Sequence, residues 1–222
     1  MQKKYQIIAL SFFGLLIFHV AGAQETAAAS AGVPWAWYLS RAAGFLAFAL
    51  LYVSIFLGLT LRIPLLRKIF APARASYVHC WISLQATLIV FLHAGVLVFD
   101  NFFHLTWQDL FVPFASSYQT IPMALGIFGF YLMVVLVATS YGKKYISRKV
   151  WRWAHSANVI LYVIVLLHVF YLGIDMQNPV VFNVFLWANA FLVFLMLTNM
   201  QLRIGDNIRM KNARALRESQ NK

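Results

Sequence analysis

The sequence has very few charged residues for its length. Lys, Arg, Asp and Glu make up 11% of its 222 residues, whereas 62% are hydrophobic. Charged residues make up about a quarter of an average soluble domain, which needs them to cover its surface. The shortage therefore excludes a water-soluble globular domain and predicts an integral membrane protein in contact with lipid.

Cysteine and acidic residues are also scarce. The single cysteine, Cys80, cannot form an intrachain disulfide. Six acidic residues oppose 18 Lys and Arg residues, for a net charge of +12. In a soluble protein this excess would indicate nucleic-acid binding, but here the positive residues lie in short segments between apolar runs. We therefore interpret the charge as a topology signal and expect no nucleic-acid partner.

The N-terminal segment has the layout of a secretory signal peptide. It carries two lysines at positions 3 and 4, continues with an apolar stretch through Val20 and ends in small residues before Gln24. A retained transmembrane helix is the alternative, because about 16 apolar residues nearly suffice to cross a membrane. We expect residues 1–23 to be a signal peptide or a first transmembrane helix, and residues 24–34 to be an external linker.

Five apolar runs follow the linker. They cover residues 35–61, 77–99, 122–141, 153–174 and 180–200. Each is about as long as the roughly 20 residues that a transmembrane helix requires. The predicted fold is an all-α integral membrane protein, a bundle of five transmembrane helices, or six if the N-terminal segment is retained. In the apolar loop 100–122 we expect a short amphipathic helix on the outer surface.

The connections between the runs alternate in charge. Those after the first, third and fifth runs are rich in Lys and Arg, whereas the others contain Asp100, Asp109 and Asp175 without Lys or Arg. The positive-inside rule places the basic connections and the tail, residues 201–222, in the cytoplasm of a bacterial-type inner membrane. The tail is then a positive stop signal or, alternatively, a helix on anionic lipid. Runs two and four are parallel, both leading outward.

Four of the six histidines lie inside two of these runs: His79 and His93 in the second, His155 and His168 in the fourth. Ionisable side chains inside a membrane usually face a partner or cofactor, because exposing a full charge there costs about 2.5–3.5 kcal/mol or more. Neutral imidazole costs less and ligates haem iron well. Interhelical hydrogen bonding is the alternative for any one histidine. The remaining two, in the leader (His19) and the outer loop (His104), are weaker candidates.

The spacing of the four histidines predicts two sites at two depths. Fourteen residues separate His79 from His93 and thirteen separate His155 from His168, which correspond to about 21 and 19.5 Å along a helix. Because the runs are parallel, His79 would pair with His155 near the cytoplasmic face, and His93 with His168 near the outer face. Each pair could hold one six-coordinate haem b, suited to electron transfer. No Cys-x-x-Cys-His motif is present for c-type attachment.

The thirteen-residue interval does not suit a regular helix. At about 100° per residue, fourteen positions bring the second histidine within about 40° of the first, whereas thirteen leave it about 140° away. Either the fourth run is irregular or its two histidines reach their irons from different flanks, and no proline lies between them.

Arg41 is a cation of the predicted outer half and lies a few residues into the first run. Haem propionates need cations or hydrogen-bond donors at the membrane edge, so Arg41 is a candidate partner for the outer haem. The alternative is that its side chain snorkels toward the outer headgroups.

Several segments resemble the ferric reductase-like transmembrane domain family, the haem-bearing membrane unit shared by ferric reductases, NADPH oxidases and the haem subunit of the bacterial methionine sulfoxide reductase system. The resemblance rests on residues 40–44, His79 with His93 followed by residues 99–100, residues 109–114, and residues 151–155 with His168. It covers residues 35–200 and implies that the four histidines ligate haem and that Arg41 stands near the outer one.

The resemblance also implies redox partners. Fused members of the family continue into flavin- and nicotinamide-binding domains, whereas a 22-residue basic tail follows Met200 here. A separate flavoprotein reductase or quinol would then reduce the inner haem, and an external acceptor such as ferric iron or a periplasmic reductase would receive the electron. The resemblance does not favour superoxide production, because Leu97 stands where such oxidases tend to place a further histidine. The chain would then be an oxidoreductase subunit, and whether it is itself an enzyme stays open.

Two other functions are compatible with the sequence. One is a quinol-linked cytochrome b of a different family, which would share the haems but not the donor. The other is a haem-free transporter or assembly factor that uses the histidines for packing or metal transit.

Overall fold

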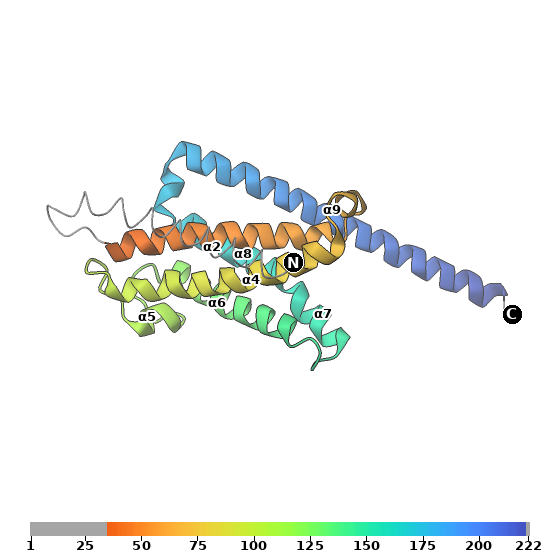
Figure 1. The fold of residues 1–222 in the computed structure, drawn as a ribbon, viewed down its shortest axis with the longest axis horizontal. Coiled ribbons are helices and arrows are strands. Elements are labelled where there is room, and N and C mark those ends of the chain that lie inside the picture. The colour runs from red at the N-terminus through yellow and green to blue at the C-terminus, as the bar shows by residue number, and fades with distance from the viewer. Residues whose placement is uncertain (1–34, 221–222) are drawn as a thin grey trace.

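The computed structural model describes residues 35–220, which form a bundle of helices without strands in that range (Figure 1). Five helical segments within it are long and apolar enough to cross a membrane: Trp35–Thr60, Pro72–Phe99, Thr120–Tyr141, Arg148–Leu172 and Pro179–Ser219. The predicted multi-pass, five-helix bundle is therefore confirmed. The predicted signal peptide or first helix, the linker and His19 lie outside the described residues.

The first two spans form an antiparallel pair. Helix α2 (Trp35–Thr60) is joined through the short helix α3 (Pro64–Ile69) to α4 (Pro72–Gly95), which the 3₁₀ helix η1 (Val96–Phe99) extends. Both α3 and α4 begin with a proline, which is well tolerated in a first turn because its missing N–H has no partner there. Buried Ala43, Ala47 and Ala86 let α2 and α4 approach closely.

The loop after η1 contains the short helix that the sequence predicted. Helix α5 (Trp107–Phe111) starts at a capping box, in which Thr106 and Asp109 each bond the backbone of the other. Hydrogen bonds from Thr106 hold the pKa of the Asp109 carboxyl below its usual range. The third span, α6 (Thr120–Tyr141), follows this loop, and His104 is exposed within it, as predicted.

The fourth span is interrupted. Helix α7 (Arg148–Ser156) ends at Ala157, whose N–H is shared between the carbonyl oxygens of Ala154 and His155, and helix α8 (Asn158–Leu172) begins after it. Ala157 has ψ −5°, well away from the usual α-helical value of about −42°. Of the two explanations for the thirteen-residue interval, the structure therefore supports an irregular fourth run.

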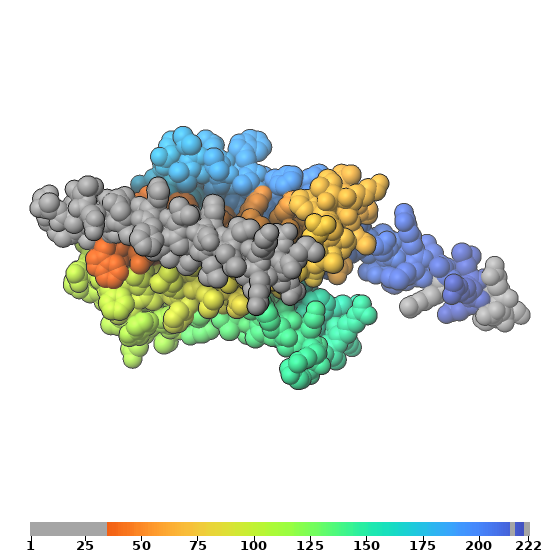
Figure 2. All heavy atoms as spheres, in the orientation of Figure 1, coloured from red at the N-terminus to blue at the C-terminus, as the bar shows by residue number. Residues whose placement is uncertain are grey.

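The last span is one long helix. The 3₁₀ helix η2 (Ile174–Gln177) leads into α9 (Pro179–Gln220), which runs through the fifth apolar run and on into the basic tail. Figures 1 and 2 show its C-terminal part projecting beyond the packed helices. Tyr162 of α8, almost fully buried, anchors α9 by donating a hydrogen bond to Asn189 Oδ1 at 2.5 Å, and Tyr52 donates one to the Ala188 oxygen.

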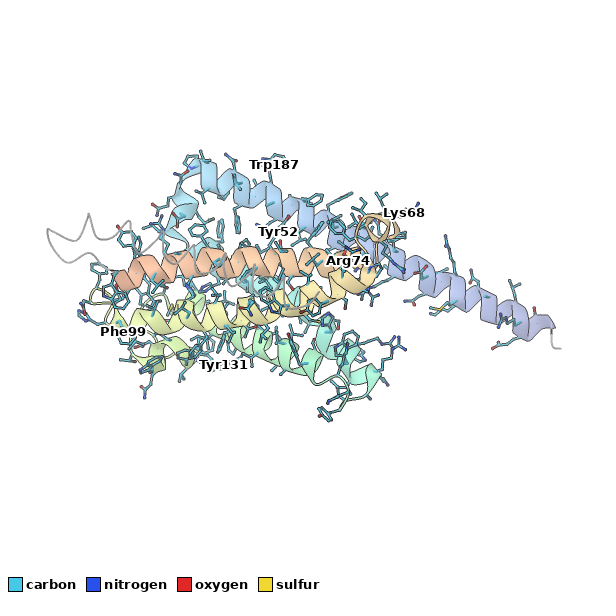
Figure 3. All side chains as sticks on the ribbon, viewed as in Figure 1. Tyr52, Lys68, Arg74, Phe99, Tyr131 and Trp187 are labelled. Atoms are coloured by element: carbon cyan, nitrogen blue, oxygen red, sulfur yellow. The ribbon has the colours of Figure 1, made fainter. Side chains whose placement is uncertain are left out.

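The two ends of the bundle differ in charge. Figure 3 shows Lys68 and Arg74 at the end from which α9 projects, and Phe99 at the opposite end. We call the former, which carries Arg62, Lys68 and Arg74, the basic end. We call the latter, which carries Asp100, Asp109 and Asp175, the acidic end.

Candidate functional site: two pairs of histidines

The four histidines of the spans meet in two pairs. His79 of α4 faces His155 of α7 at the basic end, with ring centroids 6.0 Å apart and planes at 80°. His93 of α4 faces His168 of α8 at the acidic end, with centroids 6.4 Å apart and planes at 88°. The structure thus brings together the same partners that loop charges and spacing paired in the sequence.

Both ring separations suit one iron atom between the two imidazoles. Bonds from a transition metal to imidazole nitrogen are about 2.0–2.1 Å long and the ring centroid lies about 1.1 Å further, so two trans imidazoles have centroids about 6.3 Å apart. Edge-to-face aromatic contacts also occur at about 4.5–7 Å, so distance alone does not distinguish the two arrangements. The hydrogen bonds of the rings give a second criterion.

Three of the four imidazoles bond a backbone carbonyl of a neighbouring helix through Nδ1. The contacts are His79 Nδ1 to the Ser54 oxygen at 2.7 Å, His93 Nδ1 to the Ser40 oxygen at 2.8 Å, and His168 Nδ1 to the Pro122 oxygen at 2.9 Å. A carbonyl oxygen can only accept, so Nδ1 carries the proton in each ring. The Nε2 lone pair is then free to ligate a metal, an arrangement usual for metal-bound histidine.

A glycine makes each of these carbonyls accessible. In each case the residue four positions after the carbonyl is a glycine, and the imidazole of the paired histidine lies against that glycine. A Cβ would lie 2.5 Å from His168 Cε1 at Gly126, 3.0 Å from His93 Cε1 at Gly44, and 3.5 Å from His79 Cε1 at Gly58. Gly126 therefore tolerates no side chain without a shift of the imidazole. At Gly58, by contrast, a methyl group would make an ordinary van der Waals contact with His79.

The carbonyls on α2 repeat with the spacing of the histidines on α4. Ser40 and Ser54 lie fourteen residues apart, as do His93 and His79, so the antiparallel helices meet in the same register at both ends. Sequence reasoning missed Ser54 and Gly58. The available signal was a Ser-x-x-x-Gly pattern that occurs twice in α2 at a fourteen-residue interval.

His155 is held differently. Its ring stacks on Trp151, one turn earlier, with centroids 5.1 Å apart and planes at 19°. Asn158 places its Nδ2 3.5 Å from His155 Nδ1 and 2.9 Å from the His155 oxygen. Within residues 35–220 no carbonyl accepts a hydrogen bond from this Nδ1, so His155 is oriented by stacking, with no acceptor behind it.

A cavity adjoins the basic-end pair. It is narrow, with a volume of about 30 Å³, and His79 and His155 both line it. Leucine and methionine side chains form much of its wall, and Ser140 and Tyr141 also line it. Such a lining suits a flat apolar ring with polar substituents. The indole N–H of Trp151 beside it is buried and has no acceptor among the described residues.

The donor set fits haem better than a bare metal ion. Among residues 35–220 no three His, Cys, Asp or Glu side chains gather as they would around such an ion. Two imidazoles are one of the ligand sets that haem iron takes from a protein, since the macrocycle supplies the other ligands.

Arg41 lies at the acidic end in an ion pair. Its Nε donates to Asp175 Oδ2 at 2.8 Å, its Nη2 contacts the other carboxylate oxygen, and its guanidinium stands 5.1 Å from the Trp37 ring. The sequence placed Asp175 in the outer loop but did not identify it as this partner. The role of Arg41 beside a haem propionate stays a prediction.

Comparison with known proteins gives one assignment. The chain matches no curated protein. It does match the family model described as ferric reductase like transmembrane component over residues 43–166, more than half of its length. The matched segment contains His79, His93 and His155 and stops just before His168. With its helical fold and five candidate spans, this membrane protein belongs to the ferric reductase like transmembrane component family.

Proposed function

We propose that the chain is a di-haem b electron-transfer protein, with one haem held by His79 and His155 and the other by His93 and His168. The observation that carries this proposal is the pair of near-perpendicular imidazole couples with ring separations of 6.0 and 6.4 Å. Family membership supports the same assignment. When bound, haem supplies a one-electron couple between ferric and ferrous iron.

The residues of the chain contribute position and insulation. The carbonyls of Ser40, Ser54 and Pro122 orient three imidazoles through Nδ1 and leave Nε2 of each available to ligate iron. Fourteen residues of α4 separate its two histidines, or about 21 Å. Buried apolar side chains of the core, including Ala86, Met133 and Leu161, insulate the interval between the pairs, which together would span most of the roughly 30 Å hydrocarbon layer.

The charge pattern supports a direction and a location. We place the basic end and the C-terminus in the cytoplasm of a bacterial-type inner membrane, because loops rich in Lys and Arg stay on that side. A flavoprotein reductase or quinol is then the donor at the basic end. An external acceptor, such as ferric iron or a periplasmic reductase, takes the electron at the acidic end. Residues 35–200 form the haem-binding domain in this proposal, and residues 201–222 its cytoplasmic tail.

Haem quantification tests the proposal. Purified protein should show a b-type reduced-minus-oxidised spectrum and about two protohaems per chain in the pyridine haemochrome assay. The double substitution His93→Ala with His168→Ala should remove about half of the haem, because one complete ligand pair is lost. His104→Ala, which removes an exposed histidine, is the matched control and should keep the full content. Protein without protohaem, or a double variant that loses none, would contradict the proposal.

A further inference from the structure

We propose that the basic-end haem has the higher reduction potential of the two, and that Asn158 is the positioning residue responsible, because it leaves His155 Nδ1 without a hydrogen-bond acceptor among the described residues. This inference rests on the proposed haem ligation. It concerns the order of two one-electron steps, in each of which ferric iron gains one electron to become ferrous. In the test below, a soluble redox mediator supplies that electron.

The first argument is the unequal support of the two pairs. At the acidic end both imidazoles donate Nδ1–H to a carbonyl, whereas at the basic end His79 alone does so among the described residues. An acceptor on Nδ1 makes a metal-bound imidazole a stronger electron donor. A stronger donor stabilises ferric iron relative to ferrous iron and lowers the potential, since second-shell hydrogen bonding tunes haem. The basic-end haem, with one supported ligand, should therefore be easier to reduce.

The second argument is the orientation of the Asn158 amide. Its Nδ2 donates to the carbonyl oxygen of His155 at 2.9 Å, which fixes the amide so that the same nitrogen also faces His155 Nδ1 at 3.5 Å. When Nε2 binds a metal, Nδ1 carries a proton, so two donors face each other and no hydrogen bond forms. The reversed amide would place its oxygen against the His155 carbonyl oxygen, which is unfavourable. The Asn158 amide therefore presents a donor, and not an acceptor, to His155 Nδ1.

The third argument is the charge near each pair. Arg152 precedes His155 by three residues on the same helix, α7. Burial, and then repulsion from Arg203 and Arg152, lowers the pKa of the Arg62 guanidinium, so these three cations lie near one another. At the acidic end Arg41 is instead neutralised by Asp175, in the one ion pair found among the side chains that the structure describes. Uncompensated positive charge favours the reduced, less positive iron, so charge and hydrogen bonding favour the same order.

Asn158→Asp gives a sharp test, because it replaces the Nδ2 donor beside His155 Nδ1 with a carboxylate acceptor of the same shape, at the cost of the hydrogen bond to the His155 oxygen. Optical redox titration of the purified wild-type protein should resolve two one-electron waves. In Asn158→Asp the wave of higher potential should move down by about tenfold or more in its reduction equilibrium constant, about 59 mV for one electron. The other wave should stay in place and serves as an internal reference in the same molecule.

A neighbouring substitution separates hydrogen bonding from simple charge. Ser156→Asp adds the same negative charge two residues earlier, on an exposed side chain that bonds the Trp153 oxygen. It should shift the same wave by clearly less than Asn158→Asp does. If Asn158→Asp does not fold, Asn158→Ser supplies a hydroxyl acceptor and should give a smaller shift in the same direction.

The outcomes are distinguishable. A single unresolved wave in the wild type, a shift of the lower wave in Asn158→Asp, or equal shifts in Asn158→Asp and Ser156→Asp would each overturn this inference, while the presence of two haems would leave the proposed function intact. Wild-type protein without haem would overturn both. Two waves, with the higher one moved selectively by Asn158→Asp, would support the inference.

Discussion

The two histidine pairs use the same residue type at nearly the same ring separation but hold it in different ways. At the acidic end, both rings are fixed by backbone carbonyls that glycines leave open. At the basic end, one ring is fixed in that way and the other lies on the indole of Trp151. The comparison teaches that a ring held by a backbone carbonyl needs a glycine, without a side chain, beside it. The stacked ring of His155 instead needs the large side chain of Trp151.

The largest expected effect that tests this contrast is at Gly126. A Cβ there would lie 2.5 Å from His168 Cε1, closer than any real contact, so Gly126→Ala should displace the imidazole from its carbonyl. We expect loss of about half of the haem and a destabilisation of about 1–3 kcal/mol from overpacking. Haem content per chain and thermal unfolding measure the two effects.

Gly58→Ala is the matched control for Gly126→Ala. It introduces the same methyl group at the equivalent position behind His79, where the nearest ring atom would be 3.5 Å away. Because this is ordinary van der Waals contact, the variant should retain both haems. Equal haem loss in the two variants would show that glycine is needed for helix packing in general and not for seating an imidazole.

An intermediate effect is expected at Trp151. Trp151→Leu removes the indole on which His155 stacks, so the basic-end haem should be lost more readily while the acidic-end haem stays. Dilution of the reduced protein into haem-free apomyoglobin, followed by absorbance, measures the loss rate of each haem. Trp151→Phe keeps an aromatic face and should restore most of the retention. Faster loss of both haems in Trp151→Leu would instead indicate a general loosening of the bundle.

The smallest expected effect is at the acidic-end ion pair. Asp175→Asn removes the carboxylate that Arg41 binds, and both side chains keep some exposure, 37% for Arg41 and 14% for Asp175. Pairs of this kind contribute at most about 1 kcal/mol, so the melting temperature should fall only slightly and haem content should not change. Loss of the acidic-end haem in Asp175→Asn would show that this pair positions a ligand, and would make the contrast between the two ends larger.

The sequence was sufficient for the large-scale arrangement. Apolar runs marked the five spans, and the alternation of basic and acidic loops made the second and fourth parallel, which paired His79 with His155 and His93 with His168. Hydropathy and loop charge carry this information because a bilayer imposes length and orientation on every span.

The finer features depend on tertiary contacts that sequence patterns do not encode. The interruption at Ala157 has no proline or glycine to mark it, and alanine is otherwise the best helix former. The carbonyl acceptors belong to the backbone, so no residue type identifies them except a glycine four positions later. Asp175, the partner of Arg41, lies 134 residues away in the sequence. From the sequence alone, Arg41 was equally suited to bind a haem propionate or the lipid headgroups.

Because fourteen residues are close to four turns of an α-helix, α2 presents the same seat for an imidazole twice along one face, at Ser40–Gly44 and Ser54–Gly58. The fourteen-residue interval on α2 therefore matches the fourteen-residue interval on α4, and the distance between the two sites depends on both helices. One residue inserted between His79 and His93 would rotate one ring by about 100° away from its seat. One residue inserted between Ser40 and Ser54 would turn a carbonyl away from α4 by the same angle, so both intervals can change only by whole turns of the helix.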